Sequence, residues 1–179
     1  MNVLVVSGIW PPDVGGPASH APEVAAFLHE RGHRVEVVTT AAAAPASEPY
    51  SVRWVSRSVP KGLRHLRAAA LVRACAARAD VVYTTGMFGR TFAGARAARR
   101  PYVVKLTADP AFERARRRGV VAGDVDAFQR ERGVRIAALR LARDVEMRGA
   151  AHVFGPSDSP LRFTVSCGVP WPTDSPLRP

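Results

Sequence analysis

Two adjacent glycines, Gly15 and Gly16, lie between an apolar run and a helical pattern near the start of the chain. Glycine lets a backbone approach a ligand closely, and Pro17 suits the first position of a helix because it has no N–H to leave unpaired. The free amides and the dipole at such a helix start favour a phosphate or a sugar hydroxyl. The loop therefore predicts an anion site, although the same glycines would also serve a plain tight turn.

The loop excludes two common nucleotide sites. Its sequence, PPDVGGP, is neither GxGxxG, the fingerprint of dinucleotide binding, nor GxxxxGK[ST], that of nucleoside triphosphatases. A dehydrogenase or epimerase that uses a nicotinamide cofactor is therefore not expected. We expect no bound cofactor of any kind.

Metal and thiol chemistry also find little support. His29 and His33 have the helical spacing of two ligands, but Gly32 intervenes and no third ligand is evident. Cys75 and Cys167 are 92 residues apart and neither belongs to a CxxC pair. The sequence thus predicts no metal site and no disulfide framework, which fits the reducing cytoplasm.

Strands and helices alternate along the whole chain. Residues 2–9 are nearly all apolar, which predicts a strand covered on both faces, and the following helix 17–31 carries Val24, Phe27 and Leu28 on one face. Further strands are expected at 34–40, 52–56, 80–86, 101–107 and 151–157, helices at 63–78, 87–99 and 128–148 and after the last strand, and a polar, Arg-rich excursion at 108–126. This order predicts an α/β fold, a doubly wound and mostly parallel Rossmann-like sheet.

Length and composition predict one domain. The chain has 179 residues, 47% hydrophobic and 23% charged, as in an ordinary soluble domain. We expect this domain to cover 1–170 and a tail with three prolines to cover 171–179. The apolar start has no basic residue before it, and no later stretch reaches about 18 apolar residues, so neither a signal peptide nor a membrane span is expected.

The net charge of +11 could mark an anionic partner. Of the 26 basic residues, 24 are arginine and only Lys61 and Lys105 are lysine, a bias that genome composition would produce as easily as selection for nucleic acid or membrane. In the segment 61–78, leucines alternate with arginines. That pattern is typical of a helix at an anionic membrane, and equally of an ordinary surface helix with a wet arginine face.

The run SGIWPPDVGGPASHAPEVAAFLHERGHRVEVVTT resembles the start of the amino-terminal domain of glycosyltransferase family 4, retaining enzymes of the two-domain GT-B fold. The resemblance continues through DVVYTTGMFGRTFAGARAARRPYVVKLTADPAFERA and, more weakly, through AAHVFGPSDSPLRFTVSCGVP. The order and spacing of these motifs carry it. It implies a hexosyltransferase that moves a sugar from a nucleotide-sugar donor to a glycan or a lipid-linked acceptor.

The resemblance also implies roles for particular residues. Gly15 and Gly16 would lie against the diphosphate and sugar of the donor, and the domain would mainly bind the acceptor. Asp109 matches a position near the reacting sugar and is the expected catalytic residue, although Asp before proline is also a good helix N-cap and Ala108 replaces the usual His or Gly. The expected acceptor ligands are Asp13, His20, Met87, Phe88 and Arg114.

In the resembling family, a second, carboxyl-terminal domain grips the donor, and the 179 residues leave no room for it. Half a cleft neither excludes water nor stabilises a leaving phosphate, so the chain is expected to be a truncated form that is inactive alone. Peripheral contact with the inner face of a membrane is an expected partner interaction. The alternative is a non-enzymatic basic module for anionic membrane or nucleic acid, although no nucleic-acid-binding motif is present.

Overall fold

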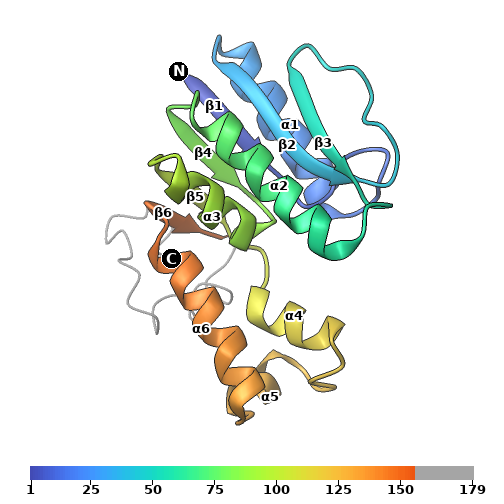
Figure 1. The fold of residues 1–179 in the computed structure, drawn as a ribbon, viewed down its shortest axis with the longest axis vertical. Helices are drawn as coiled ribbons and strands as arrows, with labels where there is room; N and C mark the ends of the chain where they lie inside the picture. Colours follow the sequence, from blue (N-terminus) through green and yellow to red (C-terminus); the bar gives the residue numbers. More distant parts are fainter. Residues whose placement is uncertain (156–179) are drawn as a thin grey trace, which may run out of the picture. The chain divides into compact units, whose positions relative to one another are not determined.

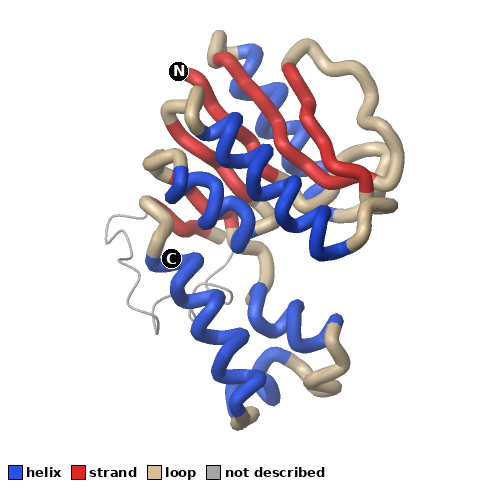
Figure 2. Tube along the Cα trace, viewed as in Figure 1, coloured by secondary structure: helices blue, strands red, loops and turns tan. Residues whose placement is uncertain are grey.

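The computed structural model describes residues 1–155, and these residues form two compact units (Figures 1 and 2). The first unit contains residues 1–105 and 150–152, and the second contains 106–149 and 153–155. The helix expected after the last strand and the predicted boundary between a domain of 1–170 and a tail of 171–179 both lie outside the described residues. That domain assignment stays a prediction.

A six-stranded sheet is the framework of the first unit, and Figure 2 draws its strands in red. Its strands are β1 (Asn2–Val6), β2 (Arg34–Ala41), β3 (Ser51–Ser56), β4 (Val81–Thr84), β5 (Tyr102–Lys105) and β6 (His152–Phe154). The order is β3-β2-β1-β4-β5-β6, and β1 pairs in parallel with both β2 and β4. The prediction of a doubly wound Rossmann-like sheet is confirmed. Strand order reverses between β1 and β4, where such sheets bind ligands beyond the carboxyl ends of the strands.

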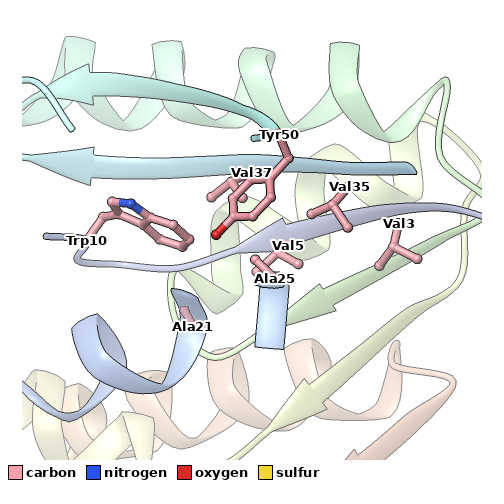
Figure 3. Close-up of a cluster of buried hydrophobic side chains, with 8 residues drawn as sticks. All are labelled: Val3, Val5, Trp10, Ala21, Ala25, Val35, Val37 and Tyr50. Carbon is pink, nitrogen blue, oxygen red and sulfur yellow. The ribbon is translucent and has the colours of Figure 1, made fainter. Parts of the chain in front are cut away.

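One sheet face is covered by helix α1 (Gly16–Glu30). Because strand side chains alternate between faces, Val3 and Val5 of β1 point to this side together with Val35 and Val37 of β2. Figure 3 shows them packed with Trp10, Tyr50, Ala21 and Ala25. Each fully buried valine contributes about 1.5–3 kcal/mol.

The buried stripe of α1 differs from the expected one. Ala21 and Ala25 are fully buried and Leu28 packs against them, whereas Phe27 is 49% exposed. The expectation that Phe27 shares the core face is therefore wrong. Its ring instead carries the guanidinium of Arg31 at 4.0 Å, since that residue lies one turn further along.

The opposite face carries α2 (Lys61–Ala76) and α3 (Phe88–Ala97), which pack against each other (Figure 1). Gly94 of α3 allows this close approach, because a Cβ there would lie 2.7 Å from Cγ1 of Val72. The two helices and α1 thus enclose the central strands from both sides. The loops described below follow the carboxyl ends of those strands.

The second unit is helical. It contains α4 (Pro110–Arg117), α5 (Val125–Arg130) and α6 (Val134–Arg148) around a core that includes Phe112, Phe128 and Ile136. One expectation is wrong here. The Arg-rich stretch contains α4, which Asp109 caps as the Asp-Pro sequence indicated, whereas the single helix expected over 128–148 breaks before Gly133, whose φ of 139° no continuous helix accommodates.

Candidate functional site

The loop between β1 and α1 is braced by buried and charged side chains. Trp10 is fully buried in the core beneath α1, and its carbonyl accepts a hydrogen bond of 3.0 Å from the amide of Asp13. Asp13 Oδ2 lies 3.1 Å from Nη2 of Arg57, a charge contact rather than an aligned hydrogen bond. The loop is therefore fastened at its middle to the sheet.

Arg57 follows β3 directly and makes a clamp across three strand ends. Its Nη2 donates to the carbonyls of Gly8, at 3.2 Å, and Thr40, at 3.3 Å, besides pairing with Asp13. Sequence reasoning missed this residue, because one arginine among 24 has no distinguishing signal. Asp13, expected as an acceptor ligand, is only 12% exposed at its side chain. That ligand role stays a prediction.

Gly15 and Gly16 are both glycine for different reasons. Gly15 has φ 152°, and a Cβ there would lie 2.7 Å from Cδ1 of Ile9, so the protein itself requires glycine. A Cβ on Gly16 would meet nothing within 4 Å. The Gly16 amide begins α1, has no side-chain cap and makes no hydrogen bond within residues 1–155. It is free to donate to a ligand.

Backbone contact joins the β1 and β4 loops at the reversal of strand order. A Cβ on Gly86 would lie 2.7 Å from the amide nitrogen of Gly8, and the Thr85 amide donates to Val6 O at 3.1 Å. The Thr85 hydroxyl is buried and has no hydrogen-bond partner in the described part of the chain. A buried hydroxyl without a protein partner is expected to bond to a ligand or a water molecule at the carboxyl end of the sheet.

Met87 and Phe88 start α3 at the same edge. Met87 is the N-cap residue, with the left-handed φ of 54°, and is 8% exposed. Phe88 is the first helical residue and is half-buried. A non-glycine residue in this backbone region is uncommon and is often found at functional sites. Their roles as acceptor ligands stay predictions.

His20, Tyr83 and Lys105 meet on the face of the sheet that α1 covers. His20 Nε2 lies 2.9 Å from the Tyr83 hydroxyl and 2.8 Å from Lys105 Nζ. Burial, and next the Lys105 ammonium, lowers the pKa of His20 below 6.5, while the exposed Glu23 opposes this shift. Burial also raises the pKa of Tyr83 to about 12. At neutral pH the ring is therefore uncharged, and its unprotonated nitrogen accepts one hydrogen bond.

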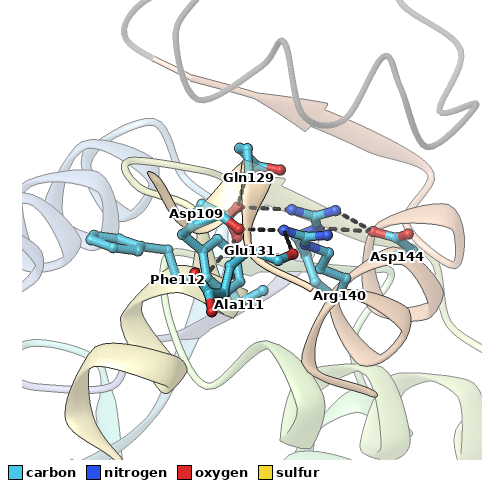
Figure 4. A network of polar contacts seen from close by, with 9 residues as sticks. Asp109, Ala111, Phe112, Gln129, Glu131, Arg140 and Asp144 are labelled. Atoms are coloured by element: carbon cyan, nitrogen blue, oxygen red, sulfur yellow. Dashed lines mark hydrogen bonds and ion pairs between the residues drawn. The ribbon is translucent and has the colours of Figure 1, made fainter. Parts of the chain in front are cut away.

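Asp109 of the second unit is held by a polar network (Figure 4). Its carboxylate caps α4 by accepting from the Ala111 amide at 2.8 Å, and it also accepts from Gln129 Nε2 at 3.0 Å and Arg143 Nη1 at 2.7 Å. Its side chain has no exposed surface, and that of Arg143 is 5% exposed. The capping role is thus observed, while the catalytic role stays a prediction.

Arg114, on the same helix α4, is likewise paired. Its Nη2 lies 2.5 Å from Oε2 of Glu146 on α6. The acceptor role expected of Arg114 stays a prediction. Within residues 1–155, no three His, Cys, Asp or Glu side chains gather as metal ligands, and no helix is long and apolar enough to cross a membrane.

Two solved structures illustrate the similarity of the fold. HepE from Anabaena, in complex with UDP-glucose, superposes with a TM-score of 0.59 at 16% identity, over 94% of this chain and 41% of its own. UGT2 from Phytolacca americana, in complex with UDP-2-fluoro-glucose and pterostilbene, gives 0.52 at 15% identity, over 98% of this chain and 51% of its own. This chain therefore spans about half the length of these structures or less.

No curated protein matches the chain significantly. A family model does: the Glycosyl transferase 4-like domain matches residues 15–171, from the glycines of the braced loop onward. This match confirms the resemblance that the motifs indicated. Since it covers most of the sequence, the chain belongs to the family of Glycosyl transferase 4-like domains.

Proposed function

We propose that this chain is the acceptor-binding half of a retaining glycosyltransferase, which moves a sugar from a nucleotide-sugar to a glycan or lipid-linked acceptor. The observation that carries the proposal is the unpaired amide of the exposed Gly16 at the start of α1. Membership of the Glycosyl transferase 4-like family supports it. So does the fold shared with HepE, which was crystallised with UDP-glucose.

The proposed chemistry follows from the charge that develops during transfer. When the sugar leaves the donor, negative charge grows on the diphosphate, and an amide at a helix start stabilises that charge without rearranging. The Arg57 clamp would keep this amide in position before the donor arrives. In retaining transfer the attacking hydroxyl enters on the face that the diphosphate leaves, so both groups would lie near the glycine loop.

Two glycine variants test the proposal. Gly16 and Gly62 both lie in the first turn of a helix with open space at the Cβ position, so Gly16→Ala and Gly62→Ala should each leave the fold intact. Only Gly16→Ala should weaken binding of UDP-glucose, by about tenfold, because its methyl group occupies the space proposed for the diphosphate. Isothermal titration calorimetry measures both. Equal affinities for the two variants would refute the proposal.

The need for a donor-binding domain stays a prediction as well. Sugar transfer from UDP-glucose would be assayed with this chain alone and with the donor-binding domain of a two-domain relative added. The proposal expects product only in the second case, because a donor held from one side is not shielded from water. Equal product in both cases would show that the chain is sufficient.

Peripheral membrane contact is a second candidate function, favoured by the surface of α2. Leu63 and Leu66 are 45% and 71% exposed and lie beside the exposed Arg67. Exposed leucines flanked by arginine fit the interface of an anionic bilayer. Sedimentation with phosphatidylserine vesicles tests this, with Leu66→Ser expected to release the protein. Binding that survives Leu66→Ser but disappears with salt would favour the purely basic module instead.

A further inference from the structure

We propose that Lys105, together with His20 and Tyr83, binds a phosphate group carried by the acceptor. This inference rests on the proposed function and names the chemistry of its acceptor. The three side chains come from β5, α1 and β4 and form one contact cluster. The glycine loop contributes none of them.

The first argument is the unfilled bonding capacity of Lys105. Its ammonium group has three donors, and its side-chain contacts within residues 1–155 are the ring nitrogens of His20, at 2.8 Å for Nε2 and 3.3 Å for Nδ1, of which a neutral ring offers one as an acceptor. In the same part of the chain no carboxylate lies within ion-pair distance of it. A half-buried cation whose protein partner is an uncharged ring favours an anion as its missing partner.

The second argument is position. Lys105 is the last residue of β5, and Tyr83 pairs with Val103, two residues earlier on the same face. The cluster therefore lies toward the carboxyl end of the sheet, the end at which doubly wound folds bind ligands. His20 follows Gly16 by four residues on α1, so the cluster is about one helical turn from the amide proposed to bind the donor.

The third argument concerns what the neighbours contribute. Neutral His20 contacts the ammonium without neutralising its charge, and Tyr83 contacts the same ring nitrogen of His20 at 2.9 Å. Glu23, which also faces His20, is exposed and forms no ion pair with Lys105. A phosphate oxygen could accept from the two remaining N–H groups of Lys105. Its charge would then be matched inside a partly desolvated site.

The small number of lysines makes the test direct. With 13C-labelled lysine, the chain gives two side-chain signals, from Lys105 and from Lys61, which is exposed at the start of α2. Titration with inorganic phosphate should shift the Lys105 signal saturably and leave that of Lys61 unchanged. Parallel, unsaturable shifts of both signals, or no shift of either, would overturn the proposal.

Variants separate this site from its surroundings. Lys105→Met should weaken phosphate binding at least about tenfold, Lys61→Met should not change it, and Lys105→Arg, which keeps the charge, should retain most of it. Retained binding in a folded Lys105→Met protein contradicts the proposal. If Lys105→Met does not fold, Lys105→Arg takes its place. Loss of phosphate binding by folded Lys105→Arg then contradicts the proposal only if phosphate also leaves the Lys105 signal of the original protein unshifted.

The same set of proteins keeps this inference distinct from the proposed function. Gly16→Ala should weaken UDP-glucose binding but leave the phosphate-induced shift of Lys105 intact. If Gly16→Ala weakens UDP-glucose binding but phosphate does not shift the Lys105 signal, the phosphate site is refuted and the glycosyltransferase proposal still holds. A saturable Lys105 shift with no binding of UDP-glucose supports the phosphate site and removes the proposed donor contact at Gly16.

Discussion

Nζ of Lys105 lies 2.8 Å from Nε2 of His20, so a cation is in direct contact with a titratable ring. Burial is the main reason that the pKa of His20 is below 6.5, and the Lys105 charge adds to it. Lys105→Met should therefore raise the pKa of His20 but leave it below 6.5, because burial outweighs the opposing effect of Glu23. A pH titration followed by NMR of the imidazole measures this. An unchanged pKa would show that the contact has no electrostatic consequence.

The lowered pKa of His20 makes stability depend on pH. The unfolded chain takes up a proton on this ring near pH 6.5, before the folded protein does, so acid favours unfolding. The stabilising contribution is complete above pH 6.5 and is lost as the pH falls through the folded pKa. Burial lowers the pKa of His65 as well, so the two effects must be separated.

His20→Gln provides that separation. The difference in melting temperature between the original protein and His20→Gln should shrink from about pH 7.5 to about pH 5, because glutamine takes up no proton. His65→Gln is measured alongside, because it isolates the contribution of the other histidine whose pKa is lowered. A difference that stays constant over this range would mean that His20 titrates alike in the folded and unfolded chains.

The Asp109–Arg143 pair predicts a large effect on stability. Asp109→Ala removes both the cap of α4 and the charge opposite Arg143, and breaking a buried pair costs about 3–5 kcal/mol. Asp109→Asn should cost less, because asparagine is an equally good cap that still accepts from the Ala111 amide. Urea unfolding ranks the two variants. Equal losses would mean that the cap contributes nothing and the charge everything.

Much of the fold was predictable because strand and helix patterns act locally. The β-branched run at residues 2–6 and the helix stop at Gly32 are visible in the sequence, and the parallel order follows from their alternation. The break before Gly133 was missed because the apolar spacing continues through it, and Phe128 and Ile136, on either side of the break, share one core with Phe112. Only the tertiary packing distinguishes one long helix from two.

Residues of the candidate site could be singled out from the sequence only where a residue type in that pattern has few uses. Gly15 and Gly16 stood out because paired glycines before a helix have few explanations. Arg57 and Lys105 did not, since their importance comes from strands that are distant in sequence: Arg57 reaches the carbonyl of Gly8, and Lys105 reaches His20. Such contacts depend on which strands are neighbours in the sheet, and the sequence indicates the strands without giving the distances between their side chains.

Arg57→Met predicts a loss of ligand affinity without a loss of fold. The variant removes the hydrogen bonds to Gly8 and Thr40 and the partner of Asp13, so the glycine loop should become mobile while the sheet stays intact. Binding of UDP-glucose should weaken about tenfold, because the amide must be ordered when the donor arrives. Hydrogen exchange of the loop amides reports the mobility. Arg53→Met, at an exposed ion pair with Glu36, is the matched control.

Gly15→Ala should act on stability rather than on binding alone. At φ 152° an alanine is strained by about 1–3 kcal/mol, and its methyl group would meet Cδ1 of Ile9 at 2.7 Å. Gly16→Ala has neither problem and, as a helical position, should leave stability equal or slightly higher. Thermal unfolding of the two variants without ligand tests the contrast. A Gly15→Ala protein as stable as Gly16→Ala would mean that the loop relaxes freely, and that the Arg57 clamp does not hold its shape.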